Sequence, residues 1–195
     1  MKREADPIRV LDMGSGEGGR YISSQGEGVN YVLVDWRLNR DIARKYPNAL
    51  WVVANAQVLP FPDGAFNKLE TRFPHGTLLC PGLERITGVD KSSEEAGTDL
   101  SKKREALTSY SEFARVLQDG GTLTIWADAP WINTEQVIID SASRFEVVSI
   151  EEEVTRKELE EMGSFGCRMW IQKMERQSQE KSDKVKKIIL RKRQL

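Results

Sequence analysis

Three glycines at alternate positions follow a short apolar run near the start of the chain. The run, residues 8–13, reads Ile-Arg-Val-Leu-Asp-Met, which is typical of a buried strand, and Gly14, Gly16 and Gly18 follow it. Small residues let a backbone pass close to a ligand, and a helix that begins after such a loop offers its first N–H groups to that ligand. The pattern predicts a ligand-binding loop.

A carboxylate ends the next β-rich run. Residues 30–35 read Asn-Tyr-Val-Leu-Val-Asp, so Asp35 lies about twenty residues beyond the glycines. An acid at this place can accept hydrogen bonds from both hydroxyls of a ribose. The glycine loop and Asp35 together indicate a site for a nucleoside cofactor at the carboxyl ends of two strands. The glycine spacing differs from the G-x-G-x-x-G pattern of dinucleotide-binding proteins.

Segments with a strand pattern alternate along the chain with segments that have a helical pattern. This alternation predicts a parallel α/β sheet, which would position the glycines and Asp35. Strands are expected at residues 8–13, 30–35, 50–54, 67–73, 122–127, 145–154 and 185–190. Helices are expected after the glycine loop, at 37–45, 102–117 and 134–143, and in an insertion of about 155–180 between the last two strands. Gly120 and Gly121 would end the helix over 102–117, as a glycine cap does. Residues 82–103 are polar and are expected to form a loop beside the site.

The motifs resemble those of the class I S-adenosylmethionine (SAM)-dependent methyltransferases. Val10–Gly18 resembles their first motif, and Asp35 resembles their ribose-binding acid. Ala54–Phe61 is similar to the segment beside the adenine, and Glu112–Leu123 is similar to their helix, Gly-Gly turn and fifth strand. The resemblance implies one Rossmann-like α/β domain over residues 1–195. Its seven-stranded sheet would be mostly parallel, with an antiparallel last strand and helices on both faces.

SAM is the cofactor that this resemblance implies, with no metal. The cofactor-binding residues would be Asp12, Gly14, Ser15, Gly16, Gly18, Asp35, Trp36, Asn55, Ala56 and Phe73. Many relatives have Asp where this chain has Asn55, whose side-chain oxygen can still accept a bond from the adenine amino group. Asp12 either caps the first helix or supports the loop near the methionine end of the cofactor.

A planar acceptor is suggested by Phe73, Pro74 and His75, which follow the expected fourth strand. Phe73–Leu79 resembles a segment of the aminoglycoside-resistance 16S rRNA adenine-N1 methyltransferases. That likeness implies an RNA base as acceptor and these three residues as the catalytic set. The chain departs from that family at His75 and Gly166, where the family has tryptophans that stack on the base. His75 either contacts substrate or has a structural role in its loop.

Trp131 and Arg168 are further candidates for substrate contact. Trp131 follows the expected fifth strand, and Arg168 lies in the expected insertion, where it would contact phosphate or only solvate a helix face. Three functions stay open: methylation of RNA, with RNA or a ribosomal subunit as partner; methylation of a small molecule beneath residues 82–103 as a lid; and SAM binding without catalysis.

The charge is balanced over the whole chain but not along it. The 195 residues carry 29 basic and 30 acidic side chains, a net charge of −1. Seven basic residues and one acid lie between 181 and 193, a net charge of +6, which leaves −7 elsewhere. This basic segment either contacts nucleic acid or solvates an edge strand.

Composition excludes several other classes of protein. No apolar run reaches the ~20 residues of a membrane span, and the first residues lack the apolar core of a signal peptide. Two cysteines and one histidine argue against a disulfide framework or a zinc site. A cytoplasmic protein without membrane or metal is therefore expected.

Overall fold

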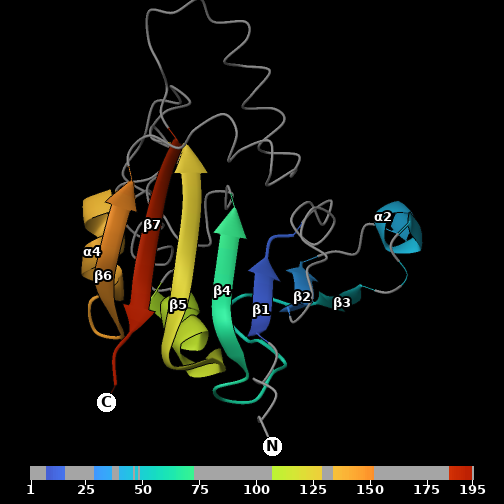
Figure 1. The fold of residues 1–195 in the computed structure, drawn as a ribbon, viewed down its shortest axis with the longest axis horizontal. Helices are drawn as coiled ribbons and strands as arrows, with labels where there is room; N and C mark the ends of the chain where they lie inside the picture. The colour runs from blue at the N-terminus through green and yellow to red at the C-terminus, as the bar shows by residue number, and fades with distance from the viewer. Residues whose placement is uncertain are drawn as a thin grey trace, which may run out of the picture.

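The computed structural model describes residues 8–15, 29–36, 40–45, 47, 49–72, 107–128, 134–151 and 185–194. These residues form one seven-stranded sheet with helices beside it (Figure 1). The strands are β1 (Ile8–Met13), β2 (Val29–Asp35), β3 (Leu50–Val53), β4 (Phe66–Arg72), β5 (Leu117–Asp128), β6 (Phe145–Glu151) and β7 (Val185–Lys192). The helices are α2 (Arg40–Lys45), residues 107–116, and α4 (Thr134–Ser141).

The strand order is β3-β2-β1-β4-β5-β7-β6. Strands β1 to β5 pair in parallel, and β7 runs antiparallel to both of its neighbours, β5 and β6. The predicted Rossmann-like sheet, mostly parallel with an antiparallel last strand, is confirmed. The order reverses between β1 and β4, and ligands of such sheets bind beyond the carboxyl ends of the strands at this point.

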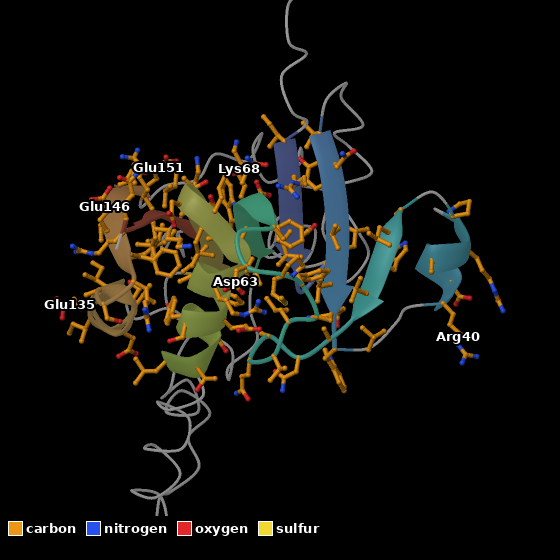
Figure 2. The ribbon with its side chains drawn as sticks, turned by 90° about the horizontal axis from the view of Figure 1, so that it is seen from below. Arg40, Asp63, Lys68, Glu135, Glu146 and Glu151 are labelled. Carbon is orange, nitrogen blue, oxygen red and sulfur yellow. The ribbon has the colours of Figure 1, made fainter. Side chains whose placement is uncertain are left out.

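One face of the sheet forms the hydrophobic core. Leu11 of β1 pairs in register with Leu69 of β4, which pairs with Leu123 of β5 and through it with Leu190 of β7. Paired residues of adjacent strands project to the same face, so these four completely buried leucines form a row. Tyr110, Phe113 and Val116 of the helix over 107–116, and Val137 of α4, join the same cluster. Both helices therefore cover this face, as the edge-on view in Figure 2 shows.

The fifth strand is longer than predicted. It begins at Leu117 rather than at residue 122, and the helix before it ends at residue 116. Leu117 pairs with Phe66 and Thr122 pairs with Lys68, so four residues of β5 bulge opposite one residue of β4. Gly120 allows the bulge because its φ is 73°, a left-handed conformation that glycine adopts without steric strain. The Gly-Gly pair shapes this bulge as well as following the helix.

Strand β7 lies inside the sheet, so the prediction that its lysines solvate an edge strand is wrong. The edges are β3 and β6. Three expected features lie outside the described residues: the helix after the glycine loop, the polar segment 82–103 and the insertion over about 155–180. Among the helices that the structure does describe, none has the length and apolar character to cross a membrane.

Candidate functional site

The loop after β1 is bonded to the end of β2. The backbone N–H groups of Gly14 and Ser15 both donate to the carbonyl oxygen of Val34, at 2.8 and 3.1 Å. Asp35 follows Val34 and pairs with Val53 of β3. Gly14 has a φ of 70°, which lets the chain turn away from the sheet at this point. The start of the glycine loop and Asp35 therefore lie side by side at the carboxyl edge.

A buried hydroxyl lies in this loop. Ser15 is 3% exposed, and its Oγ has no hydrogen-bond partner within the part of the chain that the structure describes. Buried polar atoms nearly always have a partner, so this hydroxyl suits contact with a polar ligand. Asp12, two residues before Gly14, is completely buried, and Trp36 beside Asp35 is 74% exposed. The two sides of the loop thus combine a buried carboxylate and an exposed aromatic ring.

Asn55 shapes the turn after β3. Its side-chain oxygen accepts a bond from the N–H of Gln57 at 3.0 Å, and its backbone oxygen accepts one from Val58 at 3.0 Å. The N–H of Ala54 donates to the backbone oxygen of Asp35 at 3.0 Å, which holds the turn against the end of β2. The expected adenine acceptor on Asn55 therefore has one lone pair engaged locally and one remaining. Ala56 is buried beneath the turn.

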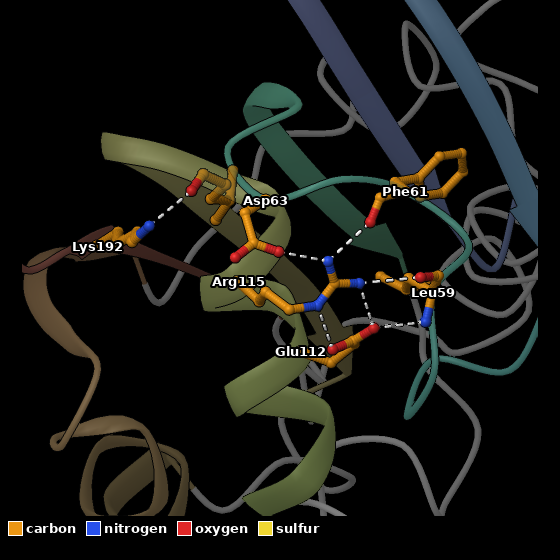
Figure 3. Close-up of polar contacts among 7 residues, drawn as sticks. Leu59, Phe61, Asp63, Glu112, Arg115 and Lys192 are labelled. Carbon is orange, nitrogen blue, oxygen red and sulfur yellow. Dashed lines mark hydrogen bonds and ion pairs between the residues drawn. The ribbon is translucent and has the colours of Figure 1, made fainter.

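Glu112 and Arg115 hold the loop that continues from this turn (Figure 3). The Arg115 guanidinium donates to the backbone oxygens of Leu59 and Phe61 at 2.9 and 2.7 Å. It also donates to both carboxylate oxygens of Glu112, at 2.6 and 2.8 Å, and to Asp63 at 2.8 Å. Glu112 in turn accepts the N–H of Leu59 at 2.6 Å. Helix 107–116 and the loop are thus joined by one hydrogen-bond network.

The charges of this network favour each other. The hydrogen bond from Arg115 lowers the pKa of Glu112 below its ordinary value, although burial opposes the change. The hydrogen bond to Glu112 raises the pKa of Arg115, so the guanidinium stays charged. Neither Glu112 nor Arg115 is among the site residues expected from the sequence. Two signals were available in the sequence: the spacing of three between Glu112 and Arg115 on a helix, and the distant segment Leu59-Pro60-Phe61-Pro62, whose carbonyls need donors.

The predicted site residues fall into two groups. Asp12, Gly14, Ser15, Asp35, Trp36, Asn55 and Ala56 lie at or next to the carboxyl ends of β1, β2 and β3. Gly16, Gly18, Phe73, Pro74, His75, Trp131 and Arg168 lie outside the described residues. Strand β4 ends at Arg72 on the same edge, because its Thr71 pairs with Met13. The carboxyl end of β4 therefore lies beside the start of the glycine loop.

The basic residues of β7 contact groups within the sheet. Lys187 lies 2.9 Å from Glu151, Arg191 lies 3.5 Å from Glu146, and Lys192 lies 3.1 Å from Asp119. Glu146 and Glu151 extend from β6, on the left of Figure 2. Arg193 donates to the backbone oxygen of Phe145 at 2.9 Å. Three cations of β7 thus lie beside acids of the sheet, and Arg193, which follows the strand, is bonded to a carbonyl oxygen.

No protein-family model matches the chain, and no curated protein matches it either. Solved structures do share its fold. The 16S rRNA methyltransferase KamB has a TM-score of 0.67 at 16% identity, covering 96% of this chain and 88% of KamB. A TehB-like SAM-dependent methyltransferase from Corynebacterium glutamicum has a TM-score of 0.56 at 16% identity, covering 97% of this chain and 83% of the methyltransferase. The [4+2]-cyclase SpnF has a TM-score of 0.58 at 17% identity, covering 97% of this chain and 75% of SpnF.

These comparisons confirm the fold that the motifs resemble, which is that of the class I SAM-dependent methyltransferases. At 16–17% identity they show the fold alone. These structural neighbours include an rRNA methyltransferase and a cyclase, so one fold serves different reactions.

Proposed function

We propose that the chain is a SAM-dependent methyltransferase. The observation that carries the proposal is the junction of β1 and β2, where the Gly14–Ser15 loop is bonded to Val34 directly beside Asp35. Asp35 would accept from the ribose hydroxyls, and the buried Ser15 hydroxyl would contact a polar group of the cofactor. Asn55 and Ala56, at the end of β3, would lie beside the adenine. The residues present fit SAM in their chemistry.

SAM, when bound, supplies a methyl group on a sulfonium that a lone pair of the acceptor displaces in line. The chain has to align that acceptor to within ~3–3.5 Å and keep water away. A ring nitrogen already has an available lone pair, whereas an alcohol usually needs a base. The roles of the chain are therefore to bind, orient and desolvate, and His75 would act as a base only for an acceptor that carries a proton.

An RNA base is the acceptor that we propose first. Phe73, Pro74 and His75 would form a wall for a flat base, because their segment resembles that of the rRNA adenine-N1 methyltransferases. Trp131 and Arg168 would contribute further contacts to the base and to phosphate. The shared fold with KamB is compatible with this acceptor, and so is a partner such as a ribosomal subunit.

A small molecule is the second candidate, and one observation favours it. Lys187, Arg191 and Lys192 of the basic segment each lie within 3.5 Å of a carboxylate in the sheet. Charges neutralised in this way attract phosphate less than free charges would. The remaining body of the chain is acidic, with a net charge of −7, which does not favour a polyanion.

Transfer of labelled methyl from SAM tests the proposal. The chain is incubated with labelled SAM and either 30S subunits, total RNA or a protein-free extract of small molecules. Label in RNA supports the first acceptor and label in the extract supports the second. Label in neither pool, together with measurable SAM binding, would contradict methyl transfer and favour a SAM-binding protein without catalysis.

His75→Ala separates a contact with the acceptor from a structural role. If His75 contacts the acceptor, turnover falls while the dissociation constant for SAM stays the same. Equal loss of turnover and of SAM affinity would support the structural role.

A further inference from the structure

We infer that Arg115, held by Glu112, is a positioning residue for the adenosine half of the cofactor site. The inference rests on the function proposed above and concerns how the turn at Asn55 keeps its place. Arg115 lies on the helix over 107–116, while Asn55 and Ala56 lie at the end of β3. The connection between them is the loop of residues 59–64.

The loop needs donors from outside because of its composition. It reads Leu59-Pro60-Phe61-Pro62-Asp63-Gly64, and neither proline has a backbone N–H. A segment with a proline at every second position cannot form an ordinary strand ladder. The carbonyl oxygens of Leu59 and Phe61 therefore depend on side-chain donors, and Arg115 supplies both bonds, at 2.9 and 2.7 Å.

Arg115 uses its whole hydrogen-bonding capacity in this network. A guanidinium has five N–H donors. Its Nε donates to Glu112, one terminal nitrogen donates to Phe61 and Asp63, and the other donates to Leu59 and Glu112. No donor is left for a cofactor or a substrate. The side chain therefore acts on the site only through the loop, which is why we assign it a positioning role.

The loop transmits this constraint to the turn at Asn55. Leu59 is 3% exposed and lies in the core, and Phe61 packs edge-on against Phe66 with ring centroids 5.0 Å apart. On the helix side, Gly64 donates its N–H to the backbone oxygen of Arg115 at 2.9 Å. Both ends of the loop are thus fixed to helix 107–116. The turn from Asn55 to Val58 is held between β3 and this anchored segment.

The chain offers a matched control for the loss of a partly buried cation. Lys192 also bonds a backbone oxygen, that of Leu117 at 2.8 Å, and an acid, Asp119 at 3.1 Å. Its side chain is 19% exposed, against 32% for Arg115. This hydrogen bond and this ion pair involve neither the loop of residues 59–64 nor the strand ends that carry the candidate site. Lys192→Met should lower the free energy of unfolding without altering ligand binding.

The experiment compares Arg115→Met, Arg115→Lys and Lys192→Met with the wild-type chain. Calorimetry measures the dissociation constants of S-adenosylhomocysteine and of 5′-methylthioadenosine, at a temperature well below every unfolding transition. We expect Arg115→Met to weaken the binding of both ligands about tenfold. Both contain the adenosine group, and the turn at Asn55 that would lie beside it has lost its support. Lysine restores the charge but not the planar arrangement of five donors. The affinity of Arg115→Lys for each ligand should therefore lie between that of Arg115→Met and that of the wild-type chain.

Turnover provides a second measurement. It uses labelled SAM and the acceptor pool that takes up label from the wild-type chain. At saturating SAM the kcat of Arg115→Met should stay within about threefold of the wild-type value, while its KM for SAM should rise. Amide hydrogen exchange should be faster at Leu59 in Arg115→Met but not in Lys192→Met, since only the first variant disturbs the partner of that N–H.

Two results would overturn the inference in different ways. In the first, the wild-type chain binds S-adenosylhomocysteine, and Arg115→Met binds it with the same dissociation constant although its free energy of unfolding is lower. This result would show that the network serves stability alone. Absence of binding by the wild-type chain would overturn the proposed function, and the inference with it.

Discussion

The ammonium nitrogen of Lys187 lies 2.9 Å from a carboxylate oxygen of Glu151 and 4.9 Å from the ring centroid of Trp126. The first contact joins β7 to β6, and the second joins it to β5. The ammonium group thus has a carboxylate on one side and the face of an aromatic ring, in a cation–π contact, on the other. This relationship assigns at least part of the basic segment to the sheet itself.

The salt dependence of RNA binding should therefore be insensitive to these residues. For any RNA that the chain binds, Lys187→Gln and Arg191→Gln should leave the slope of log K against log salt concentration unchanged. A residue that neutralises a phosphate would reduce that slope by about 0.7–0.9. Filter binding at several salt concentrations measures it, and a reduction of this size for either variant would make the residue a phosphate contact.

Asp35→Ala should weaken SAM binding by roughly 1–3 kcal/mol, because a charged acceptor of hydrogen bonds is removed. Asp41→Ala is the matched control. That residue has the same charge and lies in α2, where its side chain is 91% exposed and lies 3.7 Å from the guanidinium of Arg44. Calorimetry measures both variants. Equal affinity in Asp35→Ala and wild type would place the ribose site elsewhere.

Asn55→Asp should tighten SAM binding by about threefold or more. The carboxylate can still accept the N–H of Gln57, which now bonds Asn55 at 3.0 Å, so the turn is kept. It adds a second oxygen that can accept from the adenine amino group. Asn55→Ala removes both functions and should weaken binding. Weaker binding by Asn55→Asp would mean that the Asn55 amide donates to the ligand rather than accepting from it.

Gly121→Ala should destabilise the fold more than Gly120→Ala does. A Cβ at 121 would lie 2.8 Å from the backbone oxygen of Gln118 and 3.0 Å from that of Asn67, so the β4–β5 bulge would have to open. A Cβ at 120 meets no atom of the described residues within 4 Å, and only the φ of 73° is unfavourable, at about 1–2 kcal/mol. Urea unfolding measures both variants.

Asparagine provides the control for this comparison. Asparagine tolerates the left-handed conformation better than alanine does. Gly120→Asn should therefore regain most of the free energy of unfolding that Gly120→Ala loses, whereas Gly121→Asn should regain none of what Gly121→Ala loses. Equal recovery at both positions would contradict the crowding argument.

Acid should weaken the contribution of Glu112 to stability. Its pKa in the folded chain is below its ordinary value of about 4.3, chiefly because Arg115 donates to it. The stabilisation is therefore complete above that ordinary value and is lost as the pH falls through the lower folded value. The difference in free energy of unfolding between wild type and Glu112→Gln should shrink as the pH falls from about 5 to about 3.

The same substitution in an Arg115→Met background identifies the cause. There the pH-dependent part of the difference should largely disappear, because the main source of the lowered pKa is gone. Urea titrations at each pH measure all four chains. A difference that stays pH-dependent without Arg115 would assign the effect to another group.

Local pattern was enough to locate the strands. Ile8–Met13 has the predicted bounds, and the other strands begin or end within a few residues of those expected, except for β5 at its start. Apolar alternation is a short-range property, so it survives without knowledge of neighbours. The start of β5 could not be predicted, because Leu117 is in a strand only through its pairing with Phe66 of a distant segment.

Residue types and spacing alone predicted a nucleoside site at the ends of β1 and β2, since the glycines and Asp35 follow apolar runs directly. The structure brings Gly14, Ser15 and Asp35 together at that edge, and the bound nucleoside stays a prediction. Tertiary structure decided what sequence spacing cannot express. It placed β7 between β5 and β6, gave its cations acidic partners, and brought Arg115 to the carbonyls of Leu59 and Phe61, more than fifty residues earlier. Those contacts depend on which strands become neighbours, a choice made by burial of the whole sheet face rather than by any one segment.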